Sequence, residues 1–171
     1  MTAPEPPWAG SADTGSAATA AVHVTRELPA RREEVFRAWT QPDLFARWFT
    51  PPGNSSVSAD LDVRPGGSYR ITLERTQLVP GTSYIVGEYL EVVPPERLVF
   101  TFGWEEPPPL ANIQELAALD SRVTVQLRDR GTATEISITH ERLESPELRA
   151  FHRWGWETTL EQLAAVASSP G

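Results

Sequence analysis

The stretch Arg149–Leu163, which reads RAFHRWGWETTLEQL, decides the fold that we predict for this chain. Side chains three or four residues apart share one face of a helix, and here that face carries Leu148, His152, Trp156, Leu160 and Leu163. A glycine inside a helix, as at Gly155, costs roughly 1 kcal/mol relative to alanine. Such a glycine marks close packing or a cavity wall, and we expect it to let the helix approach a sheet closely. We expect Trp156 to face inward and Trp154 to lie at the rim or surface.

The composition is typical of one acidic globular domain. The chain has 171 residues, of which 40% are hydrophobic and 22% are charged. Its net charge is −8, and all 15 basic residues are arginines. Because an acidic surface repels phosphate groups, we expect neither nucleic acid nor an anionic membrane as a partner.

The absence of cysteine from the sequence excludes disulfides and thiol chemistry and fits a reducing compartment. The N-terminal residues do not have the basic and then apolar pattern of a secretory signal. No apolar run in the sequence approaches the length of a membrane span. The expected location is therefore cytoplasmic.

Residues 1–19 are rich in Ala, Pro, Gly, Ser and Thr, and we predict that they form a disordered N-terminal tail. The folded domain is predicted to span residues 20–168. Alternation of apolar and polar residues predicts strands at 20–28, 57–63, 69–73, 84–93, 98–104, 123–127 and 134–140. Helical spacing predicts two short helices, at 30–40 and 42–49, and a long one from 145 to about 167.

This order of elements predicts an α+β helix-grip fold. Strands joined by short turns form an antiparallel meander, and one long amphipathic helix has to cover the apolar face of the sheet. A twisted sheet of about seven strands that curls around one helix leaves a cavity between them. Residues 105–119, which include a proline run, are expected to form a flap near its mouth.

Five stretches carry a resemblance to a known family: VFRAWTQPDLFARWFTPPG (35–53), LDVRPGGSYR (61–70), GEYLEVVPPERLVFTF (87–102), GTATEISITH (131–140) and WGWETTLEQL (154–163). In this order they resemble the START-like, or SRPBCC, superfamily of birch-pollen-allergen and polyketide-cyclase proteins. Within it, the chain is similar to the branch named for the activator of heat-shock protein 90 ATPase. The resemblance covers about residues 20–166.

The resemblance implies a helix-grip fold with a cavity, but it does not imply one function. The superfamily includes lipid carriers, hormone receptors, aromatase/cyclases and co-chaperone domains. The activator proper carries an additional domain that docks the chaperone, and this chain is too short to contain it. We therefore do not expect chaperone binding.

Sequence motifs for metal or cofactor chemistry do not occur in this chain. Its three histidines, His23, His140 and His152, lack the spacing of metal ligands. The sequence also has no HExxH motif, phosphate loop, GxGxxG fingerprint or GxSxG elbow. We expect no metal and no cofactor.

The candidates for catalysis are His140, His152 and Glu88, which would form an acid/base set inside the cavity. His140 shares a strand face with two isoleucines, and Glu88 alternates with apolar residues, so both are predicted to point inward. A carboxylate and an imidazole in such a place could move protons on an enolisable substrate. In the structural alternative, His140 caps a strand end, His152 lies at the rim and Glu88 pairs with an arginine.

The predicted ligand-binding residues are mostly aromatic: Trp104, Trp156, Phe100, Phe102, Tyr69 and His152. They place large, flat surfaces where the cavity is expected, which suits a planar or polycyclic apolar ligand. Ordinary core packing is the alternative for each of them.

Three functions fit these observations. We favour binding of a small apolar or aromatic molecule without catalysis, because the sequence offers no compelling catalytic set. The first alternative is a polyketide cyclase/dehydratase-like enzyme that uses acid and base groups in the cavity. The second is a co-chaperone-type interaction module. A homodimer is a further option, since it would cover exposed strand edges.

Overall fold

The computed structural model describes residues 20–50, 54–75, 81–106 and 120–167. Its elements follow the order β1 (Val22–Leu28), α1 (Arg32–Thr40), α2 (Pro42–Trp48), β2 (Asn54–Leu61), β3 (Ser68–Arg75), β4 (Thr82–Val93), β5 (Arg97–Glu105), β6 (Ser121–Arg130), β7 (Ala133–Glu141) and α3 (Pro146–Ala167). Every predicted helix and strand is therefore present. The predicted tail lies outside the described residues, as does the predicted flap apart from residues 105 and 106.

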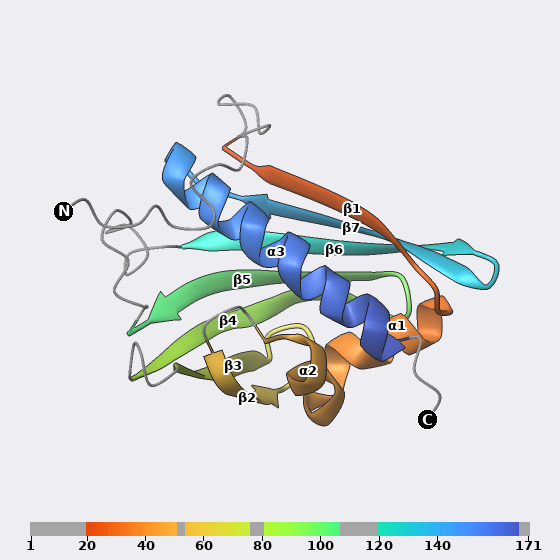
Figure 1. Ribbon diagram of the computed structural model, residues 1–171, viewed down its shortest axis with the longest axis horizontal. Helices are drawn as coiled ribbons and strands as arrows, with labels where there is room; N and C mark the ends of the chain where they lie inside the picture. Colours follow the sequence, from red (N-terminus) through yellow and green to blue (C-terminus); the bar gives the residue numbers. More distant parts are fainter. Residues whose placement is uncertain (1–19, 51–53, 76–80, 107–119, 168–171) are drawn as a thin grey trace.

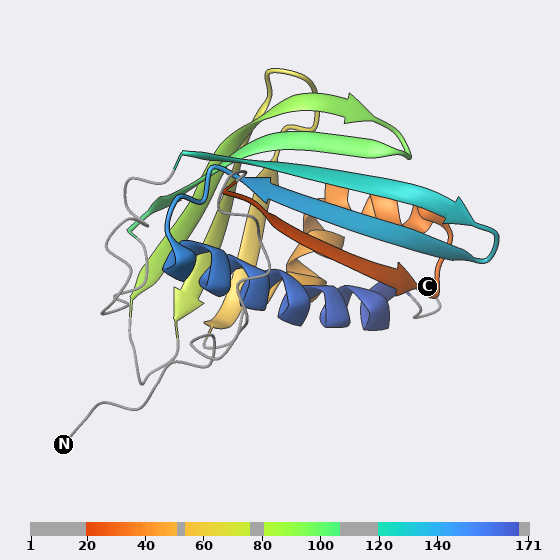
Figure 2. The ribbon, with the colours of Figure 1, turned by 90° about the horizontal axis from the view of Figure 1, so that it is seen from above.

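The strands form one seven-stranded antiparallel sheet in the order β1-β7-β6-β5-β4-β3-β2. Strands β2 to β7 follow the chain as a meander, and β1 extends the sheet by pairing with β7, with Val22 opposite His140. Figures 1 and 2 show the sheet curving around α3, which lies across its concave face. This arrangement confirms the predicted α+β helix-grip fold.

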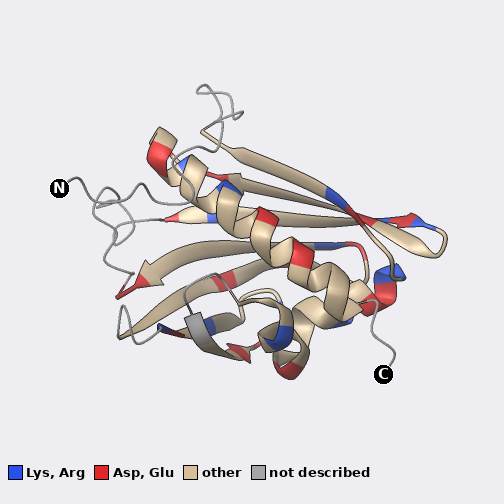
Figure 3. Cartoon of the chain, viewed as in Figure 1, with Lys and Arg blue, Asp and Glu red and all other residues tan. Residues whose placement is uncertain are grey.

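Helix α3 begins where the sequence predicts, because the Ser145 hydroxyl accepts a hydrogen bond (3.1 Å) from the Leu148 backbone N–H. All five residues of the predicted apolar face are buried: Leu148, His152, Trp156, Leu160 and Leu163. Figure 3 shows charged positions along α3, whereas the middle of the strands behind it carries few. The amphipathic pattern thus decides which side of α3 contacts the sheet.

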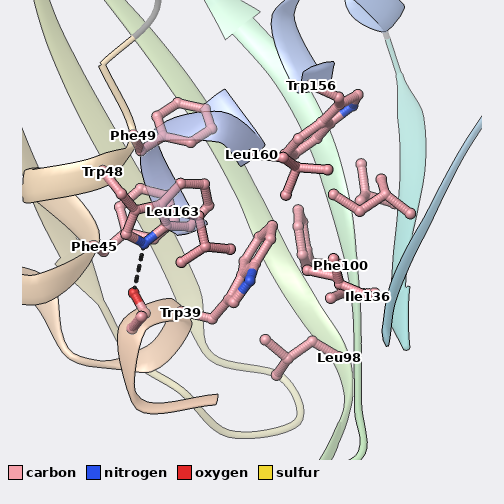
Figure 4. Packing of buried hydrophobic residues seen from close by; sticks show 14 of the residues in the cluster. Trp39, Phe45, Trp48, Phe49, Leu98, Phe100, Ile136, Trp156, Leu160 and Leu163 are labelled. Atoms are coloured by element: carbon pink, nitrogen blue, oxygen red, sulfur yellow. Dashed lines mark hydrogen bonds between the residues drawn. The ribbon is translucent and has the colours of Figure 1, made fainter. Parts of the chain in front are cut away.

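Helices α1 and α2 close one end of the space between α3 and the sheet (Figure 1). Their aromatic residues join the core: Trp39 and Trp48 lie with ring centroids 4.8 Å apart, and Phe45 packs edge-on against Trp48. The Trp48 Nε1–H donates a hydrogen bond (2.8 Å) to the Ala38 carbonyl, drawn as the dashed line in Figure 4. This bond ties α2 to α1.

The turn between β2 and β3 depends on glycine at both Gly66 and Gly67. Gly66 has φ +85°, a left-handed conformation that favours glycine. A Cβ on Gly67 would lie 2.0 Å from the Asp62 carbonyl oxygen.

No helix among the described residues is long and apolar enough to cross a membrane.

Candidate functional site

An apolar pocket of about 50 Å³ lies between α3 and the strands β4 and β5. We call it the outer pocket, and its walls are Phe49, Ile85, Phe102, Trp104, Phe151, His152, Trp154, Gly155, Trp156 and Thr159. Six of these ten residues are Trp or Phe from α3, β5 or the end of α2. The walls therefore offer flat apolar surface with few polar groups.

Gly155 forms part of the wall of the outer pocket. A Cβ built on it would meet no atom within 4 Å. The prediction that this glycine allows close approach of α3 to the sheet is therefore wrong, because the space beside it is open. The other expected role, that of a cavity wall, agrees with the structure. Trp154 is half-buried at the same pocket, as predicted for a residue of the rim.

A second space, the inner cavity, has a volume of about 20 Å³ and lies deeper between the sheet and helices α1 and α2. It is lined by Trp39, Phe45, Phe49, Leu61, Tyr69, Ile71, Tyr89, Leu98, Phe100, Phe102 and Trp156. A cavity of this size holds about one water molecule. Phe49, Phe102 and Trp156 line both spaces and separate them. The core is thus nearly filled, and among the described residues the space between the sheet and the helices consists of these two small spaces.

All six predicted ligand-binding residues line the outer pocket, the inner cavity or both. Trp104 and His152 line the outer pocket, Phe100 and Tyr69 line the inner cavity, and Phe102 and Trp156 line both. Burial raises the pKa of the Tyr69 hydroxyl well above its ordinary value. That hydroxyl donates a hydrogen bond (2.7 Å) to the Thr101 carbonyl. Tyr69 is therefore a neutral donor that is already engaged.

His140 is fully buried, and both of its ring nitrogens are engaged in hydrogen bonds. An indole can only donate, so the Trp156 Nε1–H donates to Nδ1 of His140 (3.1 Å) and fixes that nitrogen as the acceptor. Nε2 then carries the proton and donates to the Ser121 hydroxyl (2.7 Å), which in turn donates to the Phe102 carbonyl (2.8 Å). Burial, and then the neighbouring His152, lower the pKa of His140 well below its ordinary value. His140 is a neutral link between β6, β7 and α3.

His152 is the opposite tautomer. Its Nδ1–H donates to the Leu148 carbonyl (2.9 Å), and Nε2 accepts a longer bond (3.4 Å) from the Trp104 Nε1–H. Burial lowers its pKa to about 4, against the opposing effect of the bond to Leu148. The rings of His140 and His152 lie 4.7 Å apart. His152 also lines the outer pocket, whereas His140 and Glu88 line neither the outer pocket nor the inner cavity. Of the three predicted acid/base residues, His152 is therefore the one that borders an apolar space.

Glu88 does not belong to this group, and the prediction that it points inward is wrong. Its side chain is exposed, whereas Ile85 and Tyr89 on the same strand are buried. In this part of β4 the odd-numbered residues therefore point into the core. Leu90, one of the apolar residues that alternate with Glu88, is 46% exposed.

Sequence reasoning missed the contribution of α1 and α2 to the site. Trp39, Phe45 and Phe49 line the inner cavity, although the spacing of apolar residues here served only to predict the two helices. Ser121, which completes the His140 network, was also missed. A serine at a strand start carries no sequence signal for burial.

A wider surface groove of about 770 Å³ lies over β2, β3 and β4 and differs from these spaces in its polarity. Its walls include Asp60, Asp62, Arg70 and Glu105, and Arg70 forms an ion pair of 3.0 Å with Glu105. Among the described residues, no group of three or more His, Cys, Asp or Glu side chains could hold a metal ion.

The fold and its two apolar spaces define the class of this protein as a helix-grip domain with its sheet wrapped around a C-terminal helix. Residues 29–168 match the family described as Activator of Hsp90 ATPase homolog 1-like protein, and the chain belongs to this family. A comparison with curated protein sequences finds no match.

Solved structures of similar fold come from several bacteria. The protein CV1439 from Chromobacterium violaceum is 26% identical, with a TM-score of 0.70 over 88% of this chain and 98% of that one. A solution structure from Arthrobacter aurescens has a TM-score of 0.75 at 18% identity, over 92% of this chain and 91% of that one. DynU16, from the dynemicin biosynthetic locus, is 22% identical with a TM-score of 0.63, over 85% of this chain and 46% of that one.

Proposed function

We propose that this protein binds a small apolar or aromatic molecule between its sheet and α3, without catalysing a reaction. The single observation that carries the proposal is the space beside Gly155. The helix keeps a residue that costs roughly 1 kcal/mol at a position where an alanine side chain would meet nothing. Packing therefore does not explain the glycine, whereas a ligand that uses the space would.

The chemistry of the walls supports a ligand that is flat and apolar. Trp104, Phe102 and Trp156 present aromatic rings to the outer pocket, and such rings bind planar molecules through stacked or edge-on contacts. Because the outer pocket is small, we propose that the ligand enlarges it by displacing Phe49, which lies between the two spaces.

Binding without catalysis is favoured by the state of the histidines. His140 has both nitrogens engaged and borders neither space. A histidine with a pKa near 4, such as His152, is a weak base at neutral pH. Since the chain has no cysteines, we also propose the reducing cytoplasm as its location.

A titration with N-phenyl-1-naphthylamine, a neutral apolar fluorophore, tests the proposal. We expect wild-type protein to enhance its fluorescence with saturation, and Gly155→Leu to abolish the enhancement by filling the outer pocket. Glu161→Leu is the matched control, since it adds the same side chain to an exposed position of α3. Equal binding by wild type and Gly155→Leu would contradict the proposal.

A cyclase- or dehydratase-type enzyme is the second candidate, because His152 lines the outer pocket and its Nε2 is engaged only by a long hydrogen bond (3.4 Å) from the Trp104 Nε1–H. His152→Gln separates the two functions. Loss of turnover with ligand affinity retained would favour the enzyme, and unchanged conversion of any substrate found would exclude His152 as its base.

A further inference from the structure

The indole nitrogen of Trp39 is a buried hydrogen-bond donor without an acceptor. Trp39 is only 3% exposed, so water outside the protein does not reach it. The indoles of three other tryptophans each have an acceptor: Trp48 bonds the Ala38 carbonyl, and Trp104 and Trp156 each bond a histidine. An unpaired buried donor is costly, because it has lost its bonds to water without replacing them.

Trp39 lines the inner cavity, next to Phe100 at a centroid distance of 6.3 Å. In Figure 4 its nitrogen lies on the edge of the ring turned toward Leu98 and Phe100, which are also cavity walls. The Tyr69 hydroxyl at the same cavity is already bonded to Thr101. Among the described residues that line the cavity, the Trp39 nitrogen is the one buried side-chain polar atom without a partner.

The inner cavity has room for about one oxygen atom with its hydrogens, and its remaining walls are almost entirely apolar. A single acceptor oxygen placed there would satisfy the Trp39 donor. The outer pocket, in contrast, is lined mainly by apolar side chains, and its polar residues His152 and Thr159 already have hydrogen-bond partners. The two spaces together therefore suit a molecule with an apolar body and one acceptor at its end.

Phe49 is the wall that such a molecule would displace to occupy both spaces. Trp156 is held by its hydrogen bond to His140, and Phe102 belongs to the centre of strand β5. Phe49 lies at the end of the short helix α2 and is held by ring contacts, which include a stacked contact with Phe45 at 4.9 Å. Ring contacts constrain a side chain less than a directional hydrogen bond does.

We infer that the ligand is a planar apolar molecule with one carbonyl or ether oxygen, which accepts a hydrogen bond from the Trp39 Nε1–H while the apolar body fills the outer pocket. This inference rests on the proposed function and adds to it the polarity of the ligand and the residue that orients it. A water molecule in the inner cavity of the free protein would be displaced by the ligand oxygen.

Two probes that differ only in the oxygen test this inference: 1-indanone and indane. Calorimetric titration of wild-type protein should show 1-indanone binding about three to ten times more tightly, the contribution of one neutral hydrogen bond. Trp39→Phe should abolish or reverse this preference. Trp48→Phe is the matched control, since it removes an indole whose N–H is already bonded to Ala38, and it should retain the preference.

The indole N–H signals in a ¹H–¹⁵N correlation spectrum of wild-type protein give a second readout that does not depend on the folding of a variant. The Trp39 signal should move downfield with 1-indanone and not with indane. Equal affinity for the two probes, or bound 1-indanone without a Trp39 shift, would overturn the inference and leave the proposed function standing. If neither 1-indanone nor indane bound, the result would contradict the inference and the proposed function together.

Discussion

Replacement of Gly155 by alanine is expected to stabilise the protein, although glycine stands there in the natural sequence. Alanine inside a helix is more favourable than glycine by about 1 kcal/mol. The structure adds no steric penalty, because the new Cβ would meet no atom within 4 Å. We therefore expect the free energy of unfolding to rise by about 1 kcal/mol and the melting temperature by about 2–4 °C.

Urea denaturation followed by circular dichroism measures this difference directly. Gly87→Ala is the matched control, because it is the same substitution with the opposite expected sign. Its Cβ would lie 2.0 Å from the Thr101 carbonyl oxygen and 2.6 Å from the Tyr69 ring, so strands β4 and β5 would have to separate. We expect a loss of about 1–3 kcal/mol.

A loss of stability in Gly155→Ala would refute the reasoning. It would mean that α3 lies close to the sheet at this point and that the glycine serves packing. The same result would remove the main support for ligand binding, since the outer pocket would then be filled by the protein's own side chains.

Three further predictions concern the buried polar groups and the core. The pKa of His152 is about 4 in the folded protein and 6.5 in a free histidine, so the unfolded chain binds the proton first as the pH falls. The contribution of His152 to the free energy of unfolding should therefore fall by about 3 kcal/mol between pH 6.5 and pH 4. His152→Gln should remove this contribution from a pH series of urea denaturations, whereas the contribution of His140, whose pKa burial also lowers, should remain. Ser121→Ala should cost about 1–3 kcal/mol, since it leaves the Nε2–H of His140 without an acceptor, and a neutral effect would show that this bond is not formed. Leu160→Ala, at a position only 1% exposed, should cost about 2–5 kcal/mol by thermal denaturation, and a cost under about 0.5 kcal/mol would contradict its place in the core.

The helix periodicity was sufficient to predict α3 and its buried face. Leu148, Trp156 and Leu163 are buried together because residues three or four apart share one side of any α-helix, whatever lies opposite. The inward orientation of His140 was predictable for a similar reason, because the residues at alternate positions before it, Ile136 and Ile138, are apolar and are buried in the core.

The failure at Glu88 has a physical cause. Strand β4 carries apolar residues on both faces, such as Val86 and Leu90 on one and Ile85 and Tyr89 on the other, so alternation does not decide which face is buried. Pairing with β3 and β5 decides it, and the register shift between β4 and β5 near Tyr89 adds an irregularity that alternation does not reveal.

The polar contacts of the site lie beyond local sequence patterns. Ser121, His140 and Trp156 come from three different elements, and their hydrogen bonds exist only when β6, β7 and α3 are assembled. The open space at Gly155 and the unpaired nitrogen of Trp39 are likewise properties of the packed structure. A sequence shows that these residues are unusual, but not what surrounds them.

The most direct measurement of the central claim is native mass spectrometry of the purified protein, before and after incubation with an extract of small metabolites from bacterial cells. The account predicts a second species, heavier than the bare chain by the mass of one small molecule, that disappears in Gly155→Leu and persists in Glu161→Leu. A spectrum that contains only the bare chain under both conditions, together with no saturable binding of N-phenyl-1-naphthylamine, would contradict it.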